Sequence, residues 1–419
     1  MWKTAFTWLG RLALLGLAGL IVANCTMLGL NYASLETRNK PAPHPPIVAD
    51  TLEAWQTQRA PLKSAFEAHV YGPWPAGLPV QVRSKRVADP DYLDGRGVLE
   101  EWVLRIGQGD GARDVHLGLA RPAKRGSGPH PVIVAQSFVG NCYVFASTAL
   151  TDSQGQPCTS TDVPWPFEFI FGEYIAQVPM AQVFDAGFAY ANFHASEFVP
   201  DDAQRAGGVL SQLADADGET RIPQPTSALM AWAYGFKSAI DVLATDPGLD
   251  SERIAVFGHS RHGKAALIAG AWDDRIAAVV SHQSGFGGAA LSRSPVGEGV
   301  ARITRRYPHW FDPAFAAYAG RTGALPVDQH QLLALNAPTP VFLGNARRDV
   351  WSDPNSTFRA AHAASSVYGL YRPGCGAATD MSDFRPGDCL AYFLRPGGHG
   401  TDQRDMHAIL AFLTAQLGP

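Results

Sequence analysis

Short hydrophobic runs without polar interruption recur along the chain after residue 130, separated by longer amphipathic stretches. The runs are residues 131–135, 188–191, 254–257, 277–280, 341–343 and 390–394. Such runs are typical of strands that are buried on both faces of a parallel sheet. Helical stretches lie between them, for example 228–243 and 263–271. The alternation predicts a doubly wound, mostly parallel α/β sheet with helices on both faces.

Three other stretches depart from this pattern. Residues 80–120 alternate between polar and apolar side chains, as half-buried antiparallel strands do. Residues 45–69 look helical and polar, so we expect an N-terminal arm there. Residues 142–183 form a long irregular stretch without a clear period. We expect this stretch to lie beside the edge of the sheet that carries the active site.

The first forty residues have the composition of a targeting segment. Lys3 and Arg11 precede an apolar run at 12–30, which is close to the roughly 20 residues that a helix needs to cross a bilayer. We therefore expect residues 1–40 to be an export signal or a membrane anchor. Cleavage, retention in the membrane and lipidation at Cys25 all stay open. The protein is expected to be exported, either periplasmic or anchored and facing outward.

Residues 41–419 form one compositional block, which we interpret as a single catalytic domain. The 34 basic and 38 acidic residues nearly balance, so nothing indicates a nucleic-acid partner. Four cysteines follow the signal region, at positions 142, 158, 375 and 389. An even number in an exported chain predicts disulfides, and proximity favours Cys142–Cys158 and Cys375–Cys389 among three pairings. Metal binding is disfavoured because no CxxC spacing is present.

The strand at 254–257 runs through Gly258 and His259 into Ser260, and a helix follows at once. This strand–turn–helix context is what a nucleophile elbow requires, because the sharp turn leaves room only for small flanking residues. His262 occupies the position of the usual second small residue, and Gly263 follows it. Ser260 as a helix N-cap is the alternative, but it does not explain the glycines. We interpret Ser260 as the nucleophile of an α/β-hydrolase.

A serine nucleophile needs a base and an acid that orients the base, and in this fold they follow the serine along the chain. Among 13 histidines, His399 lies in a glycine-rich turn after the last expected strand, so we favour it as the base. Asp349 and Asp353 both follow the strand at 341–343, and Asp349 is nearer its end. The oxyanion donors are expected from the amide of Arg261 and from the loop 136–141.

The turn Gly258-His259-Ser260-Arg261-His262-Gly263-Lys264 resembles the Gly-Cys-Ser-Arg-x-Gly-Lys motif of the glucuronoyl esterases, carbohydrate esterase family 15. In that family the second glycine stands three residues after the serine, as Gly263 does here. Further similarity lies at residues 270–276, 284–288, 297–298, 309–311, 325–330 and around 399. The resemblance covers roughly residues 130–415 and implies an α/β-hydrolase fold and ester hydrolysis.

Two departures from the family pattern bear on the site. Many members carry the acid in Glu-Ser-Gly, whereas this chain has Gln283 at the glutamate position. Some bacterial relatives have an acid after the later strand, which supports Asp349. Fungal members join a cysteine before the serine to one after the histidine, and this chain has His259 and Gly400 there.

The resemblance implies a role for five further side chains. Arg261 would add its guanidinium to oxyanion stabilisation, while Lys264, Glu298, Gln329 and Trp351 would bind a uronic acid ring. Ordinary alternatives are a solvated lysine, a helix cap for Glu298 and simple packing for Trp351. The implied substrate is a glucuronoyl ester of plant glucuronoxylan with lignin alcohols, hydrolysed without a cofactor. A general carboxylesterase and a catalytically silent carbohydrate-binding relative stay open as alternatives.

Overall fold

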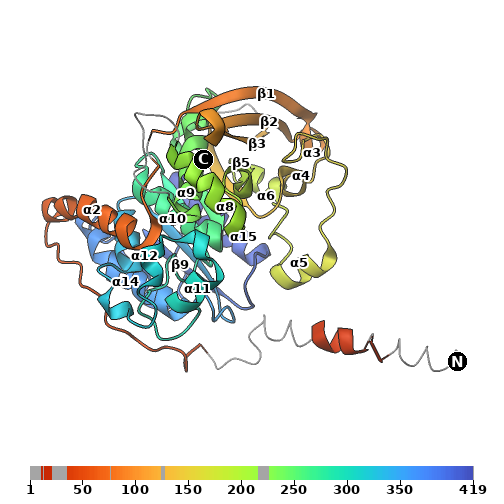
Figure 1. Ribbon diagram of the computed structural model, residues 1–419. Helices are drawn as coiled ribbons and strands as arrows, with labels where there is room; N and C mark the ends of the chain where they lie inside the picture. Colours follow the sequence, from red (N-terminus) through yellow and green to blue (C-terminus); the bar gives the residue numbers. More distant parts are fainter. Residues whose placement is uncertain are drawn as a thin grey trace.

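The computed structural model describes residues 11–12, 14–20, 35–75, 77–123, 128–215 and 226–418. Its centre is one nine-stranded sheet in the order β1-β2-β3-β5-β4-β6-β7-β8-β9 (Figure 1). The strands are β1 (Val80–Asp91), β2 (Gly97–Ile106), β3 (Arg113–Pro122), β4 (His130–Ser137), β5 (Ala189–His194), β6 (Leu249–His259), β7 (Ala278–His282), β8 (Val341–Ala346) and β9 (Leu390–Arg395).

The type of strand pairing changes once across the sheet, at β5. The first three strands pair antiparallel, and β3 pairs antiparallel with β5. From β5 to β9 every neighbouring pair is parallel. The alternating stretch at 80–120 therefore forms antiparallel strands, as its pattern predicts. The uninterrupted runs after residue 130 form strands that pair in parallel with one another. The predicted mostly parallel α/β sheet is confirmed.

Helices connect the strands and cover the sheet. They are α2 (Leu52–Phe66), α3 (Tyr92–Gly95), α4 (Asn141–Val144), α5 (Trp165–Phe171), α6 (Met180–Asp185), α7 (Ala195–Phe198), α8 (Ala203–Asp215), α9 (Ala228–Leu243), α10 (Arg261–Trp272), α11 (Val300–Arg306), α12 (Pro313–Ala316), α13 (Gln329–Leu335), α14 (Pro354–Tyr371) and α15 (Gln403–Leu417). Short turns of other helix types lie at Glu67–Tyr71, Gly109–Gly111, Pro308–Trp310 and Thr322–Ala324.

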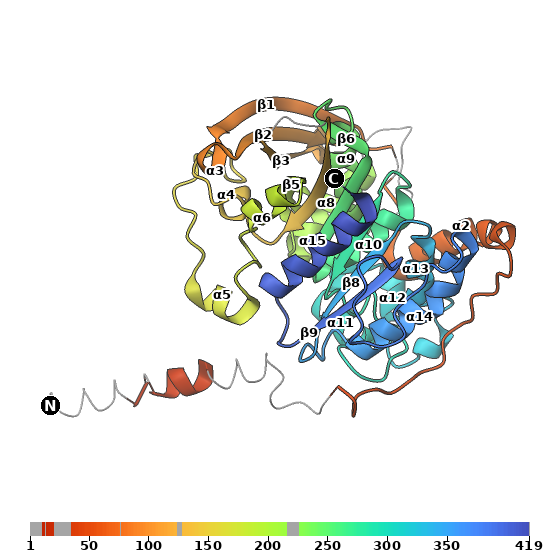
Figure 2. The ribbon, with the colours of Figure 1, turned by 180° about the vertical axis from the view of Figure 1, so that it is seen from behind.

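Alternate residues of the central strands pack into two separate cores. In β4, Val132 and Val134 belong to the core that includes α9 and α10, whereas Ile133 and Ala135 belong to the core that includes α6 and α15. Figures 1 and 2 show these two sets of helices on opposite faces of the sheet. A strand buried on both faces needs apolar side chains at every position, which explains the uninterrupted runs.

The predicted polar arm at 45–69 is partly wrong. The helix α2 begins only at Leu52, with the Thr51 hydroxyl accepting the amide of Ala54 at 3.1 Å. The prolines at 45 and 46 keep residues 44 and 45 out of a helix, and Thr51, a favoured N-cap residue, sets its first turn. Trp55 and Phe66 are completely buried, so this helix packs into the core and is no solvated arm.

The irregular stretch 142–183 contains most of three short helices, α4 to α6, and a disulfide closes its first part. Cys142 pairs with Cys158 and Cys375 with Cys389, with Cα–Cα distances of 5.9 and 5.5 Å. Both pairings favoured by proximity are thus present. The amide of Thr401 donates to the carbonyl of Phe171 at 2.7 Å, which ties α5 to the segment between β9 and α15.

Most of the apolar run 12–30, together with Cys25, lies outside the described residues. Residues 14–20 of that run are helical. Within the described ranges, no helix is both long enough and apolar enough to cross a bilayer.

Removing either disulfide should destabilise the fold by a similar amount. The bridged cysteines are separated by 16 and 14 positions, and closing a loop of that size contributes about 3 kcal/mol in the chain-entropy model. We expect Cys142→Ser/Cys158→Ser and Cys375→Ser/Cys389→Ser each to lower the free energy of unfolding by about that amount, measured by urea denaturation. Unchanged denaturation midpoints would contradict this expectation.

Candidate active site

Ser260 lies in a sharp turn between β6 and α10 at the carboxyl edge of the sheet. Its backbone has φ 56° and ψ −119°, a conformation that is strained for a residue other than glycine. A Cβ on Gly258 would lie 2.0 Å from the carbonyl oxygen of His262, and one on Gly263 would lie 2.9 Å from that of Gly258. Both glycines are therefore required by the turn. The Ser260 hydroxyl makes no capping hydrogen bond to α10, so the N-cap alternative does not account for it.

His399 and Asp349 are joined by a hydrogen bond. The His399 Nδ1 lies 2.7 Å from Asp349 Oδ2, and the Ser352 hydroxyl donates to the same oxygen at 2.6 Å. The carboxylate is almost fully buried, whereas the side chain of His399 is 27% exposed. Burial acts to raise the pKa of Asp349, but the charge of His399 and these hydrogen bonds outweigh burial and hold that pKa below its ordinary value. Asp349 therefore stays ionised.

Asp353, the alternative acid, has a different task. It precedes α14 and accepts the amide of Ser356 at 3.1 Å, which makes it the N-cap of that helix. The Ser294 hydroxyl donates to its second oxygen. Burial raises the pKa of Asp353. Its oxygens are thus engaged in holding a helix end.

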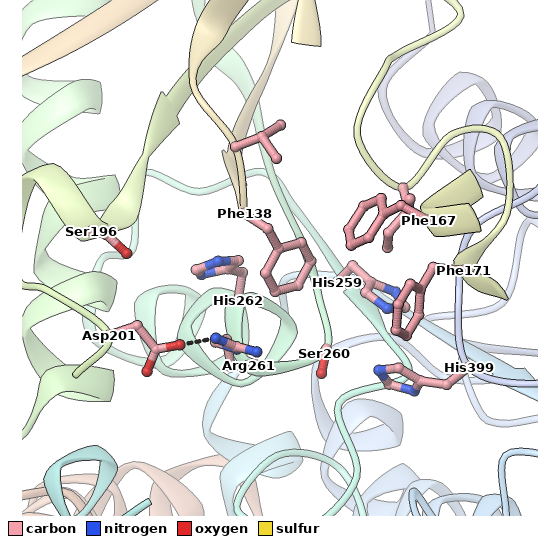
Figure 3. Close-up of a pocket in the computed structure, with 12 residues that line it drawn as sticks. Phe138, Phe167, Phe171, Ser196, Asp201, His259, Ser260, Arg261, His262 and His399 are labelled. Atoms are coloured by element: carbon pink, nitrogen blue, oxygen red, sulfur yellow. Dashed lines mark ion pairs between the residues drawn. The ribbon is translucent and has the colours of Figure 1, made fainter. Parts of the chain in front are cut away.

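Ser260 and His399 line one cavity of about 430 Å³. Figure 3 shows the two side chains next to each other, with Phe171 from α5 beside His399 and Phe167 from the same helix farther from it. Phe138, from the loop after β4, also lines the cavity. In the part of the chain that the structure describes, no three His, Cys, Asp or Glu side chains form a metal site.

The guanidinium of Arg261 is held in this cavity by an acid that the sequence did not reveal. Arg261 forms an ion pair with Asp201 and lies 5.0 Å from the ring centre of Phe138 and 5.2 Å from that of Trp310 (Figure 3). The indole of Trp310 donates to Asp201 at 2.7 Å, and the ring of His309 contacts it at 2.9 Å. Asp201 stands in a loop between two helices without any motif, so only the tertiary structure identifies it.

The loop after β4, expected to supply an oxyanion donor, is fixed by its own polar side chains. The amide of Gln136 donates to the carbonyl of Trp232 at 2.5 Å, and the Ser137 hydroxyl donates to that of Val139 at 2.7 Å. Asn192 donates to the Ser137 hydroxyl at 2.8 Å. The backbone of this loop is therefore held in one place against the cavity, as preorganised donors must be.

Three of the four expected sugar ligands gather near Asp349. Lys264 is buried and donates to the carbonyl of Ser284. Burial lowers the pKa of Lys264 to about 8, partly offset by the charge of Glu298. The amide of Glu298 donates to the carbonyl of Trp351 at 3.1 Å, and the Trp351 ring is 39% exposed.

Gln329 differs from the other three. Its side chain is 0% exposed, and its amide oxygen accepts the hydroxyl of Tyr71 at 3.1 Å. Its amide nitrogen lies 3.4 Å from the hydroxyl of Ser292. The structure therefore gives Gln329 internal partners and no surface for a sugar to contact.

Gln283, at the position of the family's glutamate, contacts the segment that carries His399. Its Oε1 accepts the amide of Gly400 at 2.8 Å, and the side chain is buried. A neutral amide is a sufficient acceptor for this contact. Position 283 thus holds the histidine turn, while the negative charge beside His399 comes from Asp349.

Several known proteins are similar to this chain in sequence or in fold. A family model described as "Glucuronyl esterase, fungi" matches residues 146–371. A carbohydrate esterase, MZ0003, of an unknown prokaryotic organism is 30% identical over 92% of this chain and 91% of its own. A 4-O-methyl-glucuronoyl methylesterase of Hypocrea jecorina is 36% identical over 57% of this chain and 54% of its own. A glucuronoyl esterase structure from Solibacter usitatus superposes with a TM-score of 0.76 at 29% identity, covering 91% of this chain and 100% of its own.

Replacing Asp349 should slow the reaction of Ser260 with a fluorophosphonate far more than replacing Asp353. Asparagine at 349 cannot hold the imidazole in the tautomer that accepts the serine proton, so we expect Asp349→Asn to slow labelling on the order of a thousandfold. Asp353→Asn is the matched control, and we expect it to keep the helix cap, because asparagine caps helices about as well as aspartate, and to change labelling much less. Gln283→Glu should label at nearly the parent rate, since a carboxylate also accepts the Gly400 amide. Equal labelling of Asp349→Asn and the parent would contradict the assignment.

Proposed function

The chain belongs to the glucuronoyl esterases of carbohydrate esterase family 15, and we propose that Ser260, His399 and Asp349 are the residues with which it hydrolyses glucuronoyl esters. It is a carboxylic ester hydrolase of the α/β-hydrolase fold. The observation that carries the residue assignment is the 2.7 Å contact between His399 and Asp349, next to a strained serine turn in the same cavity.

Acylation begins when the Ser260 hydroxyl attacks the ester carbonyl of the uronate. The Asp349 carboxylate accepts the Nδ1–H of His399, which leaves Nε2 unprotonated to take the serine proton. Negative charge develops on the carbonyl oxygen. The first amide of α10, at Arg261, and an amide of the loop 136–141 are the donors for that charge, and the Arg261 guanidinium adds to them.

The second half of the reaction uses the same groups in reverse roles. His399 gives its proton to the leaving alcohol, and the uronate stays attached to Ser260 as an ester. Water then enters, His399 removes its proton, and the hydroxide attacks the acyl carbonyl. Collapse of this second tetrahedral intermediate returns the proton to Ser260 and releases the free uronic acid.

The sugar ring is assigned to the side of the site that carries Lys264, Glu298 and Trp351. Lysine and glutamate supply a donor and an acceptor for ring hydroxyls, and a half-exposed indole offers an apolar face for a sugar to stack on. Arg302 lies 3.9 Å from the centre of the Trp351 ring, so a sugar would use the other face of the indole. Gln329, buried among Tyr71 and Ser292, acts as a support behind this surface and not as a ligand.

The alcohol lies on the other side, because His399 must protonate the leaving oxygen. That side of the cavity is lined by Phe138, Phe167, Phe171 and Ile175. Such a wall suits an aromatic alcohol, as in esters between glucuronoxylan and lignin. Trp165 and Phe169 on the same helix α5 are exposed and extend the apolar surface.

The protein acts outside the cytoplasm. Disulfides persist in oxidising compartments, and this chain has two of them. We place the catalytic part in the periplasm or on an outward-facing membrane anchor, with residues 1–40 as the targeting segment.

Substrate preference tests the proposed function directly. We expect kcat/KM for benzyl glucuronate to exceed that for an aryl acetate, because only the uronate contacts Lys264 and Trp351. Spectrophotometric or chromatographic initial rates measure both, with Ser260→Ala as the inactive control. A preference for the acetate would identify a general carboxylesterase, and failure of Ser260 to react at all would identify a silent carbohydrate-binding relative.

Lys264 gives the KM a pH dependence. With a pKa of about 8, its ammonium is charged below that pH and neutral above it, so hydrogen bonds to the sugar weaken as the pH rises through 8. We expect KM for a glucuronate ester to rise several-fold between pH 7 and pH 9 while kcat changes little. Lys264→Gln should abolish this dependence, and Lys237→Gln, a surface lysine on α9, should retain it. A parent enzyme with a flat KM would contradict the role of Lys264.

A further inference from the structure

A chain of buried polar side chains that the proposed reaction does not use lies beneath the cavity. Arg395 Nε donates to Asp405 Oδ2 at 2.6 Å, and Asp405 Oδ1 lies 3.0 Å from His282 Nε2. His282 Nδ1 lies 2.8 Å from Nδ1 of His259, the residue before Ser260. His282 and Asp405 are both 0% exposed. These residues come from the ends of β9, β7 and β6 and from the first turn of α15.

The carboxylate of Asp405 determines the direction of every hydrogen bond in this chain. A carboxylate only accepts, so His282 donates its Nε2–H to Asp405. With the single proton of His282 at Nε2, its Nδ1 accepts, and His259 donates its Nδ1–H to it. One buried charge therefore fixes the tautomers of two successive imidazoles.

The far end of the chain touches the proposed base. The ring centres of His259 and His399 are 4.6 Å apart, with 51° between the ring planes. Arg395, at the near end, donates to the carbonyl of Pro396 at 2.8 Å and to that of Gly400 at 2.7 Å. Both ends thus contact the short segment that carries His399.

Neutral His259 is compatible with a cation on its neighbour. Burial lowers the pKa of His259 well below its ordinary value, and the charges of His399 and Arg395 act in the same direction. His259 therefore stays uncharged when His399 becomes an imidazolium. Burying an ionised Arg395 and Asp405 costs free energy that apolar side chains would not require, which indicates a purpose beyond packing.

We propose that Arg395, Asp405, His282 and His259 form a positioning chain, which holds the ring of His399 in line with Ser260 through the contact between the rings of His259 and His399. Asp349 fixes the tautomer of His399 at Nδ1, and the positioning chain fixes the plane of its ring. The inference rests on the proposed role of His399 as the base. His259 also lines the cavity, whereas the other three residues are not part of its lining.

Kinetics of two variants at one position test the chain. His282→Leu removes both hydrogen bonds, and we expect kcat for benzyl glucuronate to fall about ten- to a hundredfold while KM stays within about twofold. His282→Gln should recover most of kcat, because its amide can donate to Asp405 and accept from His259. His407→Leu, an exposed histidine on the same helix as Asp405, is the control with parent kinetics. Equal kcat for His282→Leu and the parent would overturn the proposal.

Histidine NMR tests the positioning chain without relying on activity. With ¹⁵N-labelled histidine, we expect His259 protonated at Nδ1 and unprotonated at Nε2, with no titration between pH 5 and pH 9, assigned by comparison with His259→Phe. Titration of His259, or the opposite tautomer, would overturn the positioning chain and leave the esterase intact. Activity that survives in Ser260→Ala would instead overturn the proposed function, whatever the tautomer.

Discussion

The hydrogen bond between His399 and the buried carboxylate of Asp349 is the contact on which the proposed chemistry depends. A carboxylate in a dry site would normally become neutral, and here the imidazole and the Ser352 hydroxyl keep it ionised. The ionised carboxylate requires rigid surroundings, because the favourable electrostatic energy between it and the imidazole weakens as their distance grows. The parallel sheet supplies this rigidity, since the parallel strands β6 to β9 end at one edge and bring Ser260, Asp349 and His399 to it.

The sheet and the serine turn could be predicted because local physics determines them. Uninterrupted apolar runs follow from strands buried on both faces, and Gly258 and Gly263 follow from carbonyl oxygens that leave no room for a Cβ. The start of α2 at Leu52 was also within reach, because Thr51 just before it is a favoured N-cap residue. The sequence pattern of 45–69 was periodic enough to obscure that signal.

The contacts around the site could not be predicted in the same way, because they join residues that are distant in sequence. Asp201 forms an ion pair with Arg261 only because the loop that carries it passes close to the cavity. No sequence pattern marks this residue. Gln329 matched a family position but is turned inward by Tyr71, a residue from the opposite end of the chain. His282 looked like an ordinary core histidine, and only its two hydrogen bonds reveal a connection to the base.

At position 283 this chain has a neutral glutamine, and the negative charge beside His399 comes from Asp349 instead. A glutamate there could do two things at once, namely hold the Gly400 amide and face the histidine with a negative charge. In this chain Gln283 performs the first task with a neutral oxygen, and Asp349 performs the second from the end of the next strand. One acceptor and one charge are needed in either case. Because β7 and β8 are adjacent and parallel, their ends lie close enough for the two tasks to be separated while the imidazole stays in place.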